Sequence, residues 1–371
     1  PLKLDRSLLS PVWNSSSDGL FVQYDDHGHT KLALVSVDGE LHEIASDVGG
    51  TTIGRPYQSG SFSVSNNGLV AFTATDPQRP ADVAIVQPGQ PSRTLTALNA
   101  DLFEQRSLGE VEEFWTESSH DQQKIQAWLV TPPGYKAGKD APKLPLILEI
   151  HGGPFANYGW RFAAEMQLYA AAGYAVLYVN PRGSTGYGQK FVEEIHHAYP
   201  GHDFDDLMSG VDEVVKRGIA DPDNLFVTGG SGGGILTAWV VGKTGRFKAA
   251  VAAKPVINWY SFTLTTDVYP YFWQYWFSDY PWNVPNEYLA RSPISLVGNV
   301  TTPTMLMTGE NDHRTPISES EQFYQALKLR GVDSAMVRVP DASHGIVARP
   351  SNLGNKVAYV LGWFDRYRNQ K

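Results

Sequence analysis

Residues 225–233, Leu-Phe-Val-Thr-Gly-Gly-Ser-Gly-Gly, contain the only G-x-S-x-G pattern of the chain. The apolar run Leu225–Thr228 predicts a β-strand, and residues 232–242 predict a helix. A tight turn between such elements requires small residues and exposes the serine Oγ above the sheet, as in a nucleophile elbow. A plain glycine-rich turn is the alternative. A phosphate-binding loop of the Walker type is excluded because no Gly-Lys-Ser/Thr follows.

A nucleophilic serine needs a base and an acid that orients the base. In α/β-hydrolases these follow in the order Ser, Asp, His, on loops after later strands. Only His313 and His344 follow Ser231. His344 comes just after the last predicted strand and Asp312 just after an earlier one, so we predict these two with Ser231 as the catalytic triad. Asp341 as the acid and His313 as the base are the alternatives.

Strand and helix patterns alternate from about residue 111 to the C-terminus. Strands are predicted at 113–116, 124–130, 144–150, 174–179, 225–228, 249–253, 304–308 and 335–339, and helices at 203–217, 232–242, 318–329 and 355–367. The run 144–150 is apolar on both faces, which is typical of a buried parallel strand. The alternation predicts a mostly parallel sheet flanked by helices over residues 111–371, the α/β class.

The motif His151-Gly152-Gly153-Pro154 directly follows this buried strand. Backbone donors aimed at the developing negative charge contribute strongly to acyl transfer. One donor is expected to be the N–H of Gly232, directly after the nucleophile, and the second to come from a loop after an early strand. We therefore predict Gly153 and Gly232 as the oxyanion hole. A simple turn at 151–154 is the alternative.

The first 110 residues contain short β-type runs separated by turn pairs such as Asp18-Gly19 and Asn67-Gly68. Residues 18–20 are echoed at 67–69, 49 residues later. A period near 50 is typical of β-propeller blades, and an ordinary β-meander is the alternative. Residues 1–110 thus predict about two blades, too few to close a ring. We expect the chain to be the C-terminal part of a longer protein, with missing blades or a partner covering the open edge.

The composition excludes several classes of protein. The chain of 371 residues has 30 Lys and Arg against 39 Asp and Glu, and the net charge of -9 argues against a nucleic-acid partner. No apolar run reaches the ~18 residues of a membrane helix. The absence of cysteine excludes disulfides, thiol catalysis and thiolate metal sites. No metal or cofactor is implied, and neither the compartment nor a homo-oligomeric state is decided.

The chain resembles the prolyl oligopeptidase family of serine peptidases, closest to its acylaminoacyl-peptidase-like branch. The resembling stretches are 151–155, 180–188, 201–207, 229–233, 281–282, 291–293, Asp312 and 314–316. The resemblance covers nearly all of residues 112–371 and implies a propeller before an α/β-hydrolase domain. It implies a peptidase that cleaves short peptides through an acyl-enzyme without a cofactor, and it assigns the same triad and oxyanion donors. A carboxylesterase and a non-catalytic binding protein on the same fold are the alternatives.

The resemblance also matches Arg314 to an arginine that holds a backbone carbonyl of the substrate, a task that suits a guanidinium. A surface salt bridge is the alternative. The chain departs from the family at two positions. Gly232 replaces a tyrosine that usually follows the nucleophile, and His151 stands where some branches carry a tyrosine that donates to the oxyanion. The resemblance therefore implies an oxyanion hole made of backbone amides.

Between Trp259 and Trp282, twelve of 24 residues are aromatic, whereas the chain average of 12% predicts about three. Large rings form concave apolar pockets with few flexible bonds. A lid, or packing against the β-rich segment, is the alternative to a substrate pocket. The predicted substrate-binding residues besides Arg314 are Phe155, Phe272, Trp273 and Trp276.

Overall fold

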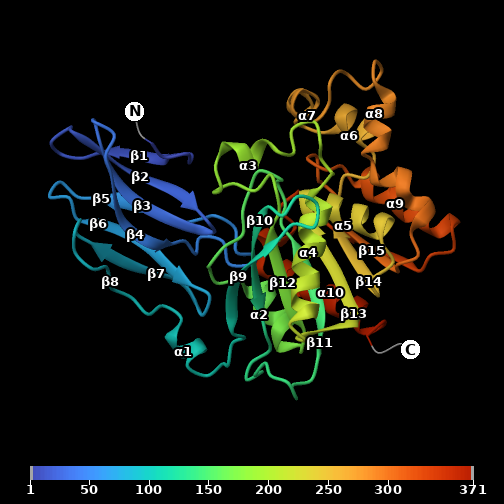
Figure 1. The fold of residues 1–371 in the computed structure, drawn as a ribbon, viewed down its shortest axis with the longest axis horizontal. Coiled ribbons are helices and arrows are strands. Elements are labelled where there is room, and N and C mark those ends of the chain that lie inside the picture. Colours follow the sequence, from blue (N-terminus) through green and yellow to red (C-terminus); the bar gives the residue numbers. More distant parts are fainter. Residues whose placement is uncertain (1–2, 369–371) are drawn as a thin grey trace.

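The computed structural model describes residues 3–368, which form two β-sheets connected by the segment 95–110. Most of the helices lie around the second sheet (Figure 1). The first sheet is antiparallel, in the order β1-β2-β3-β4-β6-β7-β8, with β5 paired to β6. Its strands are β1 (Leu9–Trp13), β2 (Gly19–Asp26), β3 (His29–Ser36), β4 (Leu41–Val48), β5 (Phe62–Val64), β6 (Val70–Asp76), β7 (Arg79–Val86) and β8 (Arg93–Thr94).

The first sheet consists of two successive four-stranded units, β1–β4 and β5–β8, which are joined where Val48 of β4 pairs with Ala74 of β6. The repeat predicted from the sequence corresponds to β2 and β6, each of which follows a tight turn. Phe21 and Leu32 of the first unit share one apolar cluster with Phe72 of the second. The segment therefore resembles two propeller blades that pack against each other. Every residue of β1 is exposed, so this edge of the sheet is open.

The second sheet has the order β16-β15-β14-β13-β11-β12-β10-β9. Its strands are β9 (Val111–Glu117), β10 (Lys124–Val130), β11 (Leu144–Ile150), β12 (Ala175–Asn180), β13 (Ala220–Gly230), β14 (Ala249–Ala253), β15 (Thr304–Gly309) and β16 (Ser334–Val339). β10 pairs antiparallel with β9 and β12. The remaining pairs, which join β12, β11, β13, β14, β15 and β16 in that order, are all parallel. The carboxyl ends of the parallel strands therefore meet at one edge, where the loops can carry a site.

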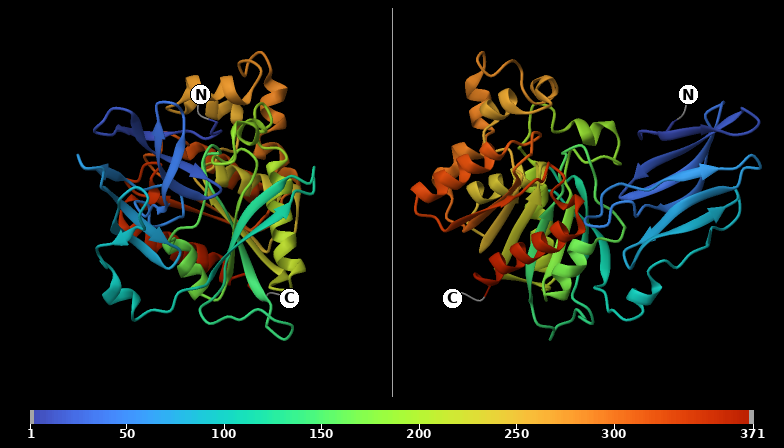
Figure 2. Two further views of the ribbon diagram at one scale, coloured as in Figure 1. Left: turned by 60° about the vertical axis from the view of Figure 1, so that its left-hand side comes forward. Right: turned by 180° about the vertical axis from the view of Figure 1, so that it is seen from behind.

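Helices cover both faces of the second sheet (Figure 2). The helices are α1 (Ala100–Phe103), α2 (Ala164–Ala171), α3 (Gln189–Glu193), α4 (Asp203–Lys216), α5 (Gly232–Lys243), α6 (Trp259–Thr265), α7 (Tyr269–Trp276), α8 (Pro285–Ala290), α9 (Ile317–Leu329) and α10 (Pro350–Asp365), with the 3-10 turns η1 (Pro293–Asn299) and η2 (Ile346–Ala348). One core cluster joins the sheet to α4, α5 and α9, and another joins it to α2 and α10. This two-faced covering is the α/β-hydrolase architecture predicted from the sequence.

The loop 49–61, between β4 and β5, packs against the second part of the chain. The backbone N–H groups of Ala164 and Glu165 donate to Ile53 O and Gly54 O at 2.7 and 2.9 Å. Tyr57 forms a β-bridge with Tyr158. The loop is thus held by backbone hydrogen bonds against α2 and the region after β11. The division of the chain into units 1–110 and 111–371 remains a prediction.

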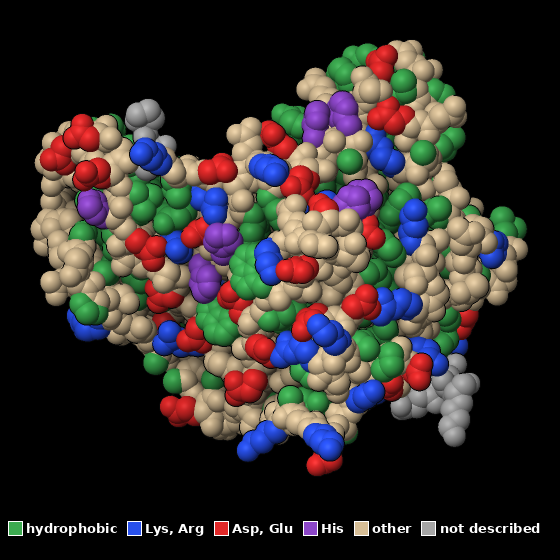
Figure 3. Space-filling view, viewed as in Figure 1, with side chains coloured by type: hydrophobic (Ala, Val, Ile, Leu, Met, Phe, Trp, Pro, Cys, Tyr) green, Lys and Arg blue, Asp and Glu red, His purple; other side chains and the backbone are tan. Residues whose placement is uncertain are grey.

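The surface is polar and mixed in charge. Acidic and basic side chains are interspersed over the face seen in Figure 3, with small apolar groups between them. None of the helices within residues 3–368 is long and apolar enough to cross a membrane.

Candidate active site

Ser231 lies between the end of β13 and the start of α5, where the predicted nucleophile elbow should be. Its φ of 60° and ψ of -122° are strained for a residue with a side chain, which is a feature of functional turns. A Cβ on Gly229 would lie 2.5 Å from Gly233 O, and one on Gly233 would clash with Ile150 O. The flanking glycines are therefore required by the close approach of β11 and α5, and the turn holds Ser231 above the sheet.

The structure brings Ser231, His344 and Asp312 into one hydrogen-bonded line. The Ser231 Oγ lies 3.0 Å from His344 Nε2, and His344 Nδ1 lies 2.8 Å from Asp312 Oδ2. With its proton on Nδ1, the imidazole donates to Asp312 and accepts from Ser231. Among the hydrogen bonds of residues 3–368, neither His313 nor Asp341 joins this line.

Asp312 is buried at the end of β15 and is kept ionised by donors on its own loop. Its Oδ1 accepts the backbone N–H groups of Arg314 and Thr315, at 3.0 and 2.9 Å. Burial alone would raise the pKa of Asp312, but the hydrogen bonds from His344 and Thr315 outweigh it, so the pKa lies below its usual value. The carboxylate is thus a fixed negative partner for the imidazole.

The environment of His344 favours its neutral form. Burial lowers the pKa of its imidazole below 6.5, the hydrogen bond with Asp312 opposes this, and the positive charge of Lys254 adds to the lowering. A neutral imidazole at pH 7 can take the proton of a serine hydroxyl.

Lys254 follows β14 directly and is a residue of this site that the sequence did not reveal. Its Nζ donates to the backbone carbonyl of His344 at 2.5 Å, and its φ is 42°. Burial and the nearby charges of Arg55 and Lys356 lower the pKa of Lys254 to about 7. A lone lysine after a strand carries no signal of such a contact, which spans 90 residues.

The two predicted oxyanion donors lie next to each other. A Cβ on Gly232 would lie 3.0 Å from Gly153 N. The strand end before them is held by His151, whose Nδ1 donates to Gly152 O at 2.8 Å and whose Nε2 lies 2.9 Å from Ser184 Oγ. Burial lowers the pKa of His151 to about 4, so this ring is neutral.

Tyr57, from the loop 49–61, reaches the same place. Its hydroxyl accepts the backbone N–H of Gly152 at 2.5 Å. A Cβ built on Gly152 would be 3.0 Å from that hydroxyl and 3.1 Å from Ser231 Cβ, so the tyrosine lies beside the nucleophile. The sequence predicted no site residue within 1–110, because this contact joins residues 95 positions apart.

A cavity of about 470 Å³ opens beside Ser231. Its walls come from the loop 49–61, from Lys254, from Glu165 of α2, and from the segment 345–356, which includes the start of α10. Apolar side chains dominate this lining, among them those of Ile53, Ile346 and Leu353. The cavity is thus formed jointly by the first and second parts of the chain.

The predicted aromatic residues lie elsewhere around the elbow. The rings of Phe155 and Phe272 contact that of Trp276, with centroids 5.5 and 5.0 Å apart. Trp276 is 2% exposed, and Trp273 instead packs on Tyr280. The structure therefore groups three of the four aromatic candidates, and their contact with substrate stays a prediction.

Arg314 follows Asp312 by two residues, and its side chain is 45% exposed. Its Nε donates to Asp267 Oδ1 at 2.7 Å. The salt bridge considered from the sequence is thus present. It engages Nε, and a role for the rest of the guanidinium in holding substrate stays a prediction.

The sequence profile of the prolyl oligopeptidase family matches residues 160–371. The chain belongs to this family. It is 37% identical over 362 residues to the uncharacterized peptidase YuxL of Bacillus subtilis, covering 96% of this chain and 53% of that protein. It is 35% identical over 231 residues to the acylamino-acid-releasing enzyme of Arabidopsis thaliana, covering 60% of this chain and 30% of that one.

Solved structures agree with this assignment. The acylaminoacyl peptidase of Pyrococcus horikoshii superposes with a TM-score of 0.87 at 27% identity, covering 99% of this chain and 57% of that one. The similarity includes both sheets, so the all-β segment and the α/β-hydrolase unit occur together in a family member. The chain spans about half the length of YuxL and of the Pyrococcus horikoshii enzyme.

Proposed function

We propose that the protein is a serine peptidase that hydrolyses short peptides, of the acylaminoacyl-peptidase or oligopeptidase type. The observation that carries the proposal is the hydrogen-bonded line from Ser231 through His344 to Asp312, with 3.0 and 2.8 Å between the paired atoms. Its membership of the prolyl oligopeptidase family supports the peptidase class.

In the proposed reaction the Oγ of Ser231 attacks the carbonyl carbon of the scissile bond, and its proton passes to His344 Nε2. The new oxyanion accepts hydrogen bonds from the N–H groups of Gly153 and Gly232. As the C–N bond breaks, His344 returns the proton to the leaving amine and the acyl group remains on the serine. Water, deprotonated by the same imidazole, then releases the acid. Asp312 keeps the proton on Nδ1 and stabilises the imidazolium.

Two features of the site support a small substrate. The cavity beside Ser231 has a volume of about 470 Å³, which suits a few residues. Both the loop 49–61 and the α/β-hydrolase unit form its wall, so a folded protein would collide with one or both of them before reaching Ser231. Acylamino-acid-releasing enzymes among the relatives favour blocked short peptides as the first class to test.

Hydrolysis of acetyl-aminoacyl anilides and short-chain esters by the intact chain tests the proposal. We expect anilide cleavage that falls at least 10³-fold in Ser231→Ala, since the nucleophile is removed. Ser63→Ala, an exposed serine of β5, is the matched control and should retain full activity. Turnover of esters alone would instead establish an esterase, and activity that survives in Ser231→Ala would disprove the triad.

A further inference from the structure

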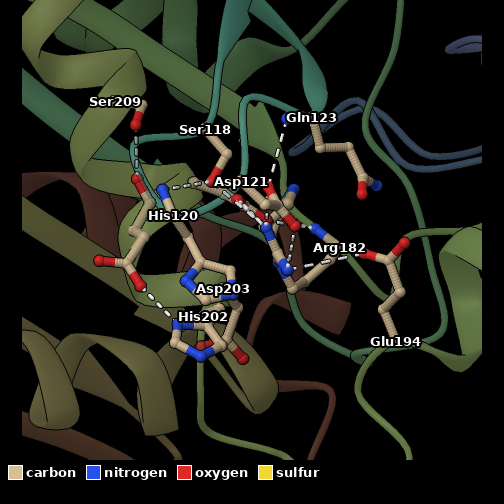
Figure 4. Close-up of polar contacts among 12 residues, drawn as sticks. Ser118, His120, Asp121, Gln123, Arg182, Glu194, His202, Asp203 and Ser209 are labelled. Carbon is tan, nitrogen blue, oxygen red and sulfur yellow. Dashed lines mark hydrogen bonds and ion pairs between the residues drawn. The ribbon is translucent and has the colours of Figure 1, made fainter.

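Two histidines and an aspartate converge on the surface where the turn between β9 and β10 meets the start of α4 (Figure 4). His120 belongs to the turn, and His202 and Asp205 belong to the entry of the helix. One ligand atom from each of the three residues lies within 4.8 Å of the other two. We propose that this cluster, which we call the His120 site, binds a divalent transition-metal ion of the Zn²⁺ type.

The donor set suits such an ion. Two imidazole nitrogens and one carboxylate oxygen are ligands that Zn²⁺ takes at about 2.0–2.2 Å, with water at the fourth position. His202 Nδ1 and Asp205 Oδ2 are 2.8 Å apart. That is a hydrogen bond in the metal-free chain. Tetrahedral ligands at about 2.1 Å from one ion lie about 3.4 Å apart, so this pair would open slightly to bind the ion. The metal ion would replace the proton that His202 and Asp205 share, so binding would release protons.

The third ligand lies close by. The rings of His120 and His202 are stacked, with centroids 3.3 Å apart and planes 11° from parallel. Both side chains are exposed, so a small rotation of either ring can turn its nitrogen towards the ion, and solvent can supply the water. The cluster therefore combines near contact of three ligands with freedom to adjust.

The surrounding charge favours a cation. Asp205 and Asp206 lie in the first turn of α4, where carboxylates offset the positive end of the helix dipole. Asp203 is 1% exposed and its Oδ2 has no hydrogen-bond partner. The nearby Arg182 is engaged by Asp121 and Asp206, at 3.1 and 2.9 Å. A bound cation would thus lie beside the Asp205 carboxylate, while the nearby guanidinium keeps its own carboxylate partners.

The ion would act as a clip between the edge hairpin and α4. The hairpin turn is already tied to the helix by Ser119 N, which donates to Ser209 Oγ at 2.9 Å, and by Arg182, which bridges Asp121 and Asp206 (Figure 4). Metal binding adds a link that exists only in the folded chain, so it should stabilise the fold in proportion to free metal. Within residues 3–368, no hydrogen bond joins a ligand of the His120 site to the proposed triad, and the proposed role of the ion is to link the hairpin to α4.

Titration of the chelator-treated full chain with Zn²⁺, by calorimetry and by thermal unfolding, tests the proposal. We expect one ion per chain with micromolar or tighter affinity, and a rise in Tm of several degrees at saturating metal. Co²⁺ should give visible absorption bands from a site with nitrogen and oxygen ligands. His202→Ala and His120→Ala should each weaken binding at least tenfold and abolish the Tm rise.

The stacked pair His196 and His197, with centroids 4.1 Å apart, offers a matched control. Within residues 3–368, no carboxylate groups with this pair as Asp205 does with His120 and His202. His196→Ala should therefore bind Zn²⁺ like the unaltered chain. Asp205→Asn, which keeps the shape of the side chain, is a second variant if either alanine variant loses its circular dichroism. Absence of stoichiometric binding at 100 μM Zn²⁺, or binding unchanged in His202→Ala and Asp205→Asn, would overturn the proposal. Labelling of Ser231 by a fluorophosphonate is independent of either result.

Discussion

Replacing Arg55 by Met should destabilise the chain strongly, because this arginine brings its charge from the loop 49–61 into the α/β-hydrolase unit. It pairs with Glu149 at 2.9 Å and with Glu165 at 3.3 Å, and both carboxylates are 0% exposed. Removing one partner of a buried ion pair costs about 3–5 kcal/mol, since the other charge is left uncompensated. Lys356 still pairs with Glu165, so we expect a loss near 3 kcal/mol, mainly from Glu149.

The pH dependence of the loss identifies its cause. Burial raises the pKa of Glu149, and the charge of Arg55 opposes that rise. In Arg55→Met the pKa of Glu149 should rise further, so the folded variant holds this proton to a higher pH than the folded wild type. The deficit in unfolding free energy should therefore be largest at high pH and should shrink as the pH falls and Glu149 becomes neutral.

Urea unfolding followed by tryptophan fluorescence and circular dichroism measures the loss, with a fall in Tm of roughly 5–10 °C expected. The double variant Arg55→Met/Glu149→Met should recover most of the stability, because the unpaired charge is gone. Arg106→Met is the matched control, since Arg106 is exposed and its guanidinium donates to the carbonyl of the neighbouring Gln105 at 3.4 Å. This variant should lose less than about 0.5 kcal/mol in unfolding free energy. Equal stability of Arg55→Met and Arg106→Met would refute the reasoning.

Two further predictions concern the site. The kcat/KM of anilide hydrolysis should rise with pH through an apparent pKa below 6.5, because burial and Lys254 lower the pKa of His344. In Lys254→Met this rise should move to higher pH, because the positive charge is removed. Lys136→Met, which changes an exposed lysine, should leave the profile unchanged. Tyr57→Phe removes the hydroxyl that accepts the Gly152 N–H. We expect the unfolding free energy to fall by about 1–2 kcal/mol and kcat to fall roughly tenfold, which is less than the loss of a direct oxyanion donor would cause. Unchanged kcat and Tm would contradict this role.

The α/β-hydrolase unit could be predicted closely because its strands are apolar on both faces and its elbow has a unique pattern. The strand predicted at 144–150 has the same bounds in the structure, and the helix predicted at 318–329 begins one residue earlier. The helix predicted at 355–367 begins at Pro350, whose ring favours a first turn. α2 was not predicted, because its buried residues include the polar Glu165 and Gln167 while Leu168 is exposed, and it has no side-chain cap.

The parts of the site that depend on distant contacts could not be predicted. The order of Ser231, Asp312 and His344 along the chain is a property of the fold and is visible in the sequence. The approach of Tyr57 to the elbow depends on how the loop 49–61 packs, and no local pattern reports packing. The same holds for Trp273, whose aromatic character predicted a pocket wall equally with Trp276, although only Trp276 contacts Phe155.

The central claim is that Ser231 is a nucleophile activated by His344. Reaction of the folded chain with a fluorophosphonate probe, followed by peptide mass spectrometry, tests it most directly. The account predicts one adduct per chain, on Ser231, and a rate of labelling that falls at least a hundredfold in His344→Ala. An adduct on another serine, or no adduct on a chain with intact circular dichroism, would contradict it.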